Sequence, residues 1–102
     1  MPKVPKKERS IALYETILQL KDLDQCCRFF DDLCTANELR TLEQRFDVAI
    51  LLDDGRVYTE ILEKTGASSA TISRVNRVFS NGNGAFQEMI DKRKEDIASE
   101  PS

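Results

Sequence analysis

The chain has 102 residues, of which 40% are hydrophobic and 32% are charged, and this balance is typical of one small globular domain. Its 4 glycines and 3 prolines exclude collagen-like, disordered and turn-rich β-sandwich chains. The chain has no histidine, which removes the commonest general base and zinc ligand, and its net charge of −3 provides no overall positive field for nucleic acid. We therefore expect no enzyme, no cofactor and no metal site.

The three cysteines form no metal-binding or redox motif. Cys26 and Cys27 are adjacent, no C-x-x-C spacing occurs with Cys34, and a cysteine-only zinc site needs a larger set of thiolates. The chain starts without an apolar signal segment, and its longest apolar run, Val48 to Leu52, is far too short to cross a bilayer. We expect a cytoplasmic protein with reduced thiols and no membrane partner.

Two terminal segments flank the predicted domain, which spans residues 8–97. Residues 1–7 are basic and contain Pro2 and Pro5, so they are expected to form a flexible arm rather than a helix. This arm is either a frayed terminus or a segment that reaches DNA phosphates. Residues 98–102 are expected to form a polar tail.

Two helices are predicted in the N-terminal third, over residues 8–20 and from Asp22 or Asp24 to Leu33. Both carry apolar residues on more than one helical face. In the first these residues are Ile11, Leu13, Tyr14, Ile17, Leu18 and Leu20, and in the second they are Leu23, Cys26, Cys27, Phe29, Phe30 and Leu33. A chain this short cannot cover such wide apolar stripes, so we expect a homodimer whose N-terminal helices interlock.

A third helix is predicted over residues 36–52. Thr35 and Glu38 fit a capping box, in which each side chain accepts a hydrogen bond from the backbone N–H of the other residue. Gly55 follows two aspartates and is free to take the left-handed conformation that ends a helix. The predicted core face consists of Leu39, Leu42, Phe46, Ala49, Ile50 and Leu52.

Residues 58–79 are predicted to form two helices joined by a tight turn at Gly66, as in a DNA-binding helix-turn-helix. The residues expected to face inward are Ile61, Leu62, Ile72 and Val75, and Ala67 is small enough to sit in the turn. A structural corner between two helices can show the same spacing, so the spacing alone leaves both interpretations open. The clustering of hydroxyl residues and an arginine at the start of the second helix favours DNA binding.

A glycine-containing polar loop at residues 80–84 separates this helix pair from a last amphipathic helix at residues 85–96. The apolar side of that helix consists of Phe86, Met89, Ile90 and Ile97. No alternating strand pattern occurs in the sequence. The expected class is therefore all-α, with five or six helices and a helix-turn-helix.

The second helix of the pair has a polar face suited to double-stranded DNA. Hydroxyls and backbone N–H groups at a helix start can take a phosphate, arginine can bond guanine, and asparagine can bond adenine. The candidate DNA-binding residues are Ser68, Ser69, Thr71, Ser73, Arg74, Asn76 and Arg77. Residues 56–79 hold Arg56, Lys64, Arg74 and Arg77 against two glutamates, so this segment is locally positive in an acidic chain.

These motifs resemble the bacterial Trp repressor family. Gly66-Ala67 followed by Thr71-Ile72-Ser73-Arg74 is similar to the family's recognition region, and Leu33 to Glu38 is similar to its Leu-Thr-Pro-Asp-Glu helix start. Leu42, Arg45, the apolar run to Leu52 and Gly55 match in order, with one residue deleted after Gly55. The similarity is close over residues 33–79 and is strongest to the YerC/YecD-type Trp-repressor-like proteins.

The resemblance implies an intertwined all-α homodimer with one DNA-reading head per subunit. It also implies a ligand site, because Thr35, Arg45, Thr71 and Arg74 match positions around the repressor's tryptophan. Val75 and Val78 stand where the repressor has glycine and serine, so we expect tryptophan to fit badly and an effector, if used, to be another small molecule. Arg45 is equally consistent with a solvated or ion-paired side chain.

Two functions remain open at this point. The first is a dimeric transcriptional regulator that reads a pseudo-palindromic operator in the major groove. The second is a protein-interaction or oligomerisation module that keeps the fold without reading DNA, which the acidic net charge and the adjacent thiols favour.

Overall fold

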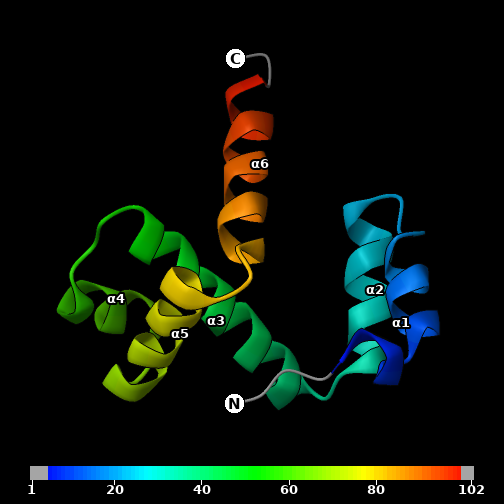
Figure 1. Ribbon diagram of the computed structural model, residues 1–102, viewed down its shortest axis with the longest axis horizontal. Helices are drawn as coiled ribbons and strands as arrows, with labels where there is room; N and C mark the ends of the chain where they lie inside the picture. The colour runs from blue at the N-terminus through cyan, green and yellow to red at the C-terminus, as the bar shows by residue number, and fades with distance from the viewer. Residues whose placement is uncertain (1–4, 100–102) are drawn as a thin grey trace. The chain divides into compact units, whose positions relative to one another are not determined.

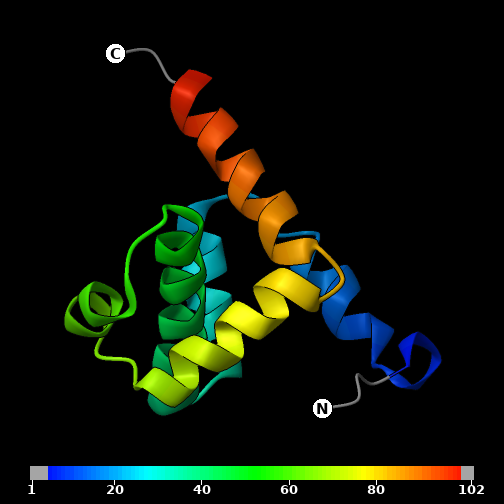
Figure 2. The same ribbon diagram turned by 60° about the vertical axis from the view of Figure 1, so that its left-hand side comes forward.

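Helices and turns account for all the secondary structure of residues 5–99, which are the residues that the computed structural model describes (Figures 1 and 2). No strand occurs among them, so the all-α prediction is confirmed for the described part of the chain. The elements are the 3-10 turn η1 (Lys6–Glu8), α1 (Ile11–Ile17), α2 (Leu23–Leu33), α3 (Ala36–Asp53), α4 (Tyr58–Thr65), α5 (Ser69–Asn81) and α6 (Ala85–Ser99). They form two compact units, Met1–Leu39 and Arg40–Ser102.

The first helix is shorter than predicted and is preceded by a short turn. The arm expected at residues 1–7 falls largely on residues 1–4, outside the described part, whereas Lys6–Glu8 form η1. The carbonyl of Pro5 accepts a hydrogen bond from the N–H of Glu8 at 2.9 Å. Proline is tolerated at the start of such a turn, whereas its ring would disrupt the hydrogen bonding at a later position. After α1 the chain continues to Leu20 in single hydrogen-bonded turns.

The last helix is longer than predicted, because α6 extends to Ser99 rather than ending near Asp96. Two residues of the expected polar tail, Ala98 and Ser99, are therefore helical, and the rest of that tail lies outside the described residues. Alanine favours helix, and no glycine or proline occurs between Ala85 and Ser99 that would end α6 earlier.

Side-chain caps begin α2 and α3 in the first unit, as predicted. Asp22 caps α2 by accepting from the N–H of Gln25 at 2.8 Å. Thr35 and Glu38 form the capping box of α3, with N···O distances of 2.8 and 3.1 Å. The hydrogen bond from the N–H of Thr35 lowers the pKa of Glu38, because it favours the carboxylate form. These are local contacts, and for that reason the sequence could predict them.

The apolar residues of the first unit are largely uncovered. None of the described residues in this unit is buried, and Leu18 and Leu23 are 81% and 79% exposed. Leu33 is 48% exposed at the end of α2. All three cysteines are free, with Cys27 exposed and the other two half-buried. The wide apolar stripes expected from the sequence are therefore present, and their residues are half-buried or exposed.

The second unit contains the hydrophobic core. Its fully buried residues come from α3, α4, α5, α6 and the α4–α5 turn, and they are Val48, Ala49, Ile61, Ala67, Ile72, Val75 and Ile90. Two expected inward-facing leucines are not in it, since Leu42 is 46% and Leu62 is 43% exposed. Only the first turns of α6 reach this core, while its C-terminal half projects beyond α3 and α5 in both views (Figures 1 and 2).

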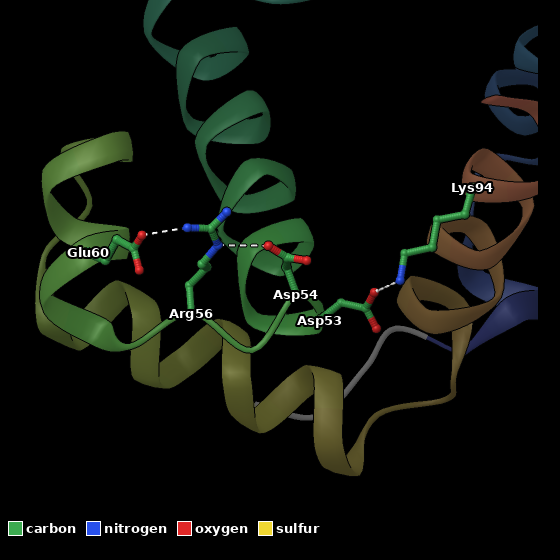
Figure 3. A network of polar contacts seen from close by, with 5 residues as sticks. All are labelled: Asp53, Asp54, Arg56, Glu60 and Lys94. Carbon is green, nitrogen blue, oxygen red and sulfur yellow. Dashed lines mark hydrogen bonds and ion pairs between the residues drawn. The ribbon is translucent and has the colours of Figure 1, made fainter. Parts of the chain in front are cut away.

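Polar contacts connect the end of α3 with the start of α4 and with α6 (Figure 3). Arg56 bridges Asp54 at 2.7 Å and Glu60 at 2.6 Å. Asp53 accepts hydrogen bonds from Lys94 and, at 3.0 Å, from Gln87, both on α6. The Arg56 contacts are local and lie beside the left-handed turn at Gly55, whose φ is 78°, whereas the Asp53 contacts join α3 to α6.

Asp53 should contribute to stability in a pH-dependent way. Hydrogen bonds from Lys94 and then from Gln87 lower its pKa, so its contribution is complete above the unfolded value of about 3.9 and is lost as the pH falls through the folded value. We expect the difference in thermal midpoint between wild type and Asp53→Asn to shrink as the pH falls from neutral into that acid range. Circular dichroism melts at stepped pH measure this difference, and one that stays constant would contradict the expectation.

Candidate nucleic-acid interface

A glycine with positive φ makes the sharp junction between α4 and α5. Gly66 has φ 73° and donates from its N–H to the carbonyl of Leu62 at 2.8 Å, which closes the last turn of α4. An added Cβ would meet nothing within 4 Å, so the backbone conformation, rather than crowding, requires glycine here. Ala67 follows and is 1% exposed, as the spacing predicted for a small residue in the turn.

The side chain of Thr65 stabilises the turn by hydrogen bonds to the backbone on either side. Its Oγ1 donates to the carbonyl of Ile61 at 2.8 Å and accepts from the N–H of Ala67 at 3.1 Å. The carbonyl of Thr65 accepts from Nε2 of Gln44 on α3 at 3.1 Å. The turn is thus bonded both within itself and to the long helix that supports it.

Hydroxyl groups occupy the start of α5. Ser68 is the N-cap and accepts from the N–H of Thr71 at 3.2 Å, while the two side-chain oxygens lie 3.1 Å apart. Ser69 follows and is exposed. These hydroxyls and the first N–H groups of α5 lie at a helix start, where they can donate hydrogen bonds to a phosphate oxygen.

The two faces of α5 differ sharply in exposure. Ile72 and Val75 are buried in the core of the second unit, at 0% and 3% exposure. The seven candidate DNA-binding residues lie on the rest of the helix and its cap. Thr71 and Asn76 are half-buried, and the exposed ones are Ser68, Ser69, Ser73, Arg74 and Arg77. One structured helix therefore presents a mainly polar face to solvent, in which Ala70 and Val78 are the exposed apolar residues.

The charges near this face differ from the sequence-based expectation at one position. Arg56 was counted with the local positive charge, but its guanidinium is engaged by Asp54 and Glu60, which also raise its pKa (Figure 3). Within residues 5–99, Arg74 and Arg77 form no ion pair. Arg56 therefore has a structural contact, which its spacing of four residues from Glu60 could have indicated.

The four expected ligand positions are divided between the two units. Thr35 is in the first unit, where its hydroxyl oxygen accepts within the capping box. Arg45 is half-buried in the middle of α3, and Thr71 and Arg74 lie one turn apart on α5, in the second unit. Val75, the valine expected to crowd an aromatic ligand, has its side chain in the buried core that α5 shares with α3.

Comparison with known proteins yields a consistent family assignment. A family model described as Trp repressor protein matches residues 9–94. The chain is 53% identical over 83 residues to YerC of Bacillus subtilis (strain 168), an uncharacterized protein, and the match covers 81% of this chain and 80% of YerC.

Solved structures have a closely similar fold. A TrpR-like protein from Eubacterium eligens ATCC 27750 superposes with a TM-score of 0.83 at 46% identity, covering 88% of this chain and 96% of its own. A second structure, from Staphylococcus aureus, gives a TM-score of 0.82 at 42% identity, with 87% and 92% covered.

Proposed function

Because this chain belongs to the Trp repressor family, a fold family of helix-turn-helix DNA-binding regulators, we propose that it is a cytoplasmic, homodimeric transcriptional regulator that reads a pseudo-palindromic operator. In this proposal α5 enters the major groove, and α4 crosses the DNA backbone beside it. Base edges are contacted by Arg74, Asn76 and Arg77, and phosphates by the hydroxyls around Ser68.

The observation that carries this proposal is the division of α5 into a buried and a polar face. A helix that served only as a structural corner would have no need for exposed arginines that form no ion pair within residues 5–99, beside a cluster of hydroxyls. Arg74 and Arg77 are exposed on a helix whose opposite side is held in the core by Ile72 and Val75. A rigidly held helix with a free polar face can place base-reading side chains reproducibly.

Homodimerisation is supported by the apolar surface that the chain leaves uncovered. The first unit has no buried residue among those described, and Met89 and Ile97 on α6 are 52% and 53% exposed. Exposed apolar surface on this scale marks an interaction site. A two-fold dimer would present two α5 helices to DNA, so its operator would have two symmetry-related half-sites.

DNA binding is tested by mobility shift with a duplex of random sequence at low salt, followed by selection from a randomised duplex library. Non-specific phosphate binding needs no known operator, so the first experiment is informative by itself. We expect a shift that weakens with salt, and selected sites with two half-sites roughly 34 Å apart. Absence of any DNA binding at low salt would contradict the proposal and favour the interaction module, for which the net charge of −3 is the supporting observation.

Tryptophan should neither bind tightly nor be needed for DNA binding. The side chain of Val75 fills part of the core where α5 packs on α3, and Val78 adds a half-exposed apolar group one turn later. Compared with the glycine and serine of the repressor, these two valines leave less room for an indole ring and fewer polar partners for tryptophan. Calorimetry with tryptophan tests binding, and a shift assay with dialysed protein tests the requirement. Micromolar binding that Arg45→Ala abolishes would contradict this expectation.

A further inference from the structure

The turn between α4 and α5 is bonded to α3 by a residue that does not itself lie in the helix-turn-helix. Gln44, in the middle of α3 and half-buried, donates from Nε2 to the carbonyl of Thr65 at 3.1 Å. The last carbonyls of a helix have no partner within that helix, and Thr65 is the last residue of α4. Gln44 therefore supplies the hydrogen bond that the end of α4 lacks.

The same residue, Thr65, controls the backbone on both sides of the turn. Its hydroxyl donates back to Ile61 in α4 and accepts from the N–H of Ala67, which leads into α5. A contact that holds the main chain of Thr65 therefore holds both helices of the pair. Ser68, the cap of α5, follows Ala67 directly. The start of the polar face is therefore three residues from Thr65, whose carbonyl accepts the hydrogen bond from Gln44.

We propose that Gln44 is a positioning residue for DNA recognition, which fixes the orientation of α5 relative to α3 through the carbonyl of Thr65. The inference rests on the proposed DNA-binding function. The side chain of Gln44 is uncharged and is occupied by a contact within the protein, so it acts through α5 and not on DNA. Its loss leaves every charge of the polar face in place.

This role predicts that Gln44 affects recognition of a specific site more than general DNA binding. Base-reading side chains need a defined helix orientation, and a helix that must be ordered on binding reduces affinity. Attraction to phosphates depends on the number of basic groups near the DNA and is the same for every sequence. The ratio of affinities for a selected duplex and a random duplex therefore reports the positioning role.

The test compares Gln44→Met with wild type, using the duplex selected by the wild-type protein and a random duplex of equal length. Methionine keeps the length of the side chain and removes the donor. The matched control is Gln87→Met, which also removes a long-range hydrogen bond within the second unit, to Asp53 at 3.0 Å, but away from the turn. Thermal midpoints of all three proteins are measured, and binding is assayed well below them.

We expect Gln44→Met to lose roughly fivefold in affinity for the selected duplex, a factor typical of one net hydrogen bond, with unchanged affinity and salt slope on random DNA. Gln87→Met should keep the wild-type ratio of the two affinities. The inference is overturned if Gln44→Met keeps the wild-type ratio, or if Gln87→Met lowers it equally.

If Gln44→Met does not fold, Gln44→Asn replaces it, because that amide is one methylene too short to reach Thr65, and the same loss is expected. If the wild-type protein binds no DNA at all, the proposed function is contradicted. If the wild type binds DNA and the Gln44 variant keeps the wild-type ratio of the two affinities, only the positioning role is contradicted.

Discussion

Replacing Arg74 and Arg77 together with alanine should abolish selective DNA binding. Both side chains are exposed on α5, and within residues 5–99 neither forms an ion pair, so nothing in the described chain competes for them. A base-contacting arginine is worth about 1–3 kcal/mol and its loss relaxes specificity at one position, whereas a lost phosphate contact weakens all sequences and reduces the salt slope by about one. The double variant should therefore bind a selected duplex no better than random DNA.

Quantitative titrations at several salt concentrations, on selected and random duplexes, measure both effects. The matched control removes the same net charge elsewhere, through Lys92→Ala and Arg93→Ala on the exposed side of α6. That control should retain selectivity, because it changes the overall field of the protein without touching the polar face of α5. If the Arg74 and Arg77 double variant keeps the affinity and salt slope of wild type, this surface is not the DNA-binding surface.

Introducing aspartate at both Leu18 and Leu23 should prevent assembly of the protein. These leucines are 81% and 79% exposed in the single chain, and in the proposed dimer each would be covered by the partner. Burial of a leucine stabilises by about 1.5–3 kcal/mol, and a buried carboxylate without a partner costs more than that. Because the first unit has no buried residue of its own among those described, we expect its helices to lose structure when the dimer is broken.

Light scattering should give about twice 11.6 kDa for wild type, with a thermal midpoint that rises with protein concentration. The variant should give a single-chain mass and a weaker helical signal in circular dichroism. Val57→Asp is the matched control, since Val57 is 64% exposed at the start of α4, outside the first unit, and the change should leave the mass unaltered. A wild-type protein that is a stable, cooperative monomer at micromolar concentration would contradict the dimer.

Local signals in the sequence determined where α2, α3 and α5 begin and where α3 and α4 end. Asp22, Thr35 and Ser68 cap the helices that follow them, and Gly55 and Gly66 take the left-handed conformation at the turns. Each signal acts within a few residues of the helix end that it controls, so it does not depend on how the rest of the chain packs. The helix spacing also placed Ile72 and Val75 on the buried face of α5, and by difference it identified the polar face.

The tertiary structure alone decided which apolar residues the chain covers and which polar groups meet across helices. Helical periodicity placed Leu42 and Leu62 on inward faces, yet both are exposed, because a face is buried only where another element lies against it. The contacts of Gln44 with Thr65 and of Asp53 with Lys94 join residues 21 and 41 positions apart. Such pairs depend on how the helices pack, which no pattern within one helix encodes, and one of them supports the turn that positions α5.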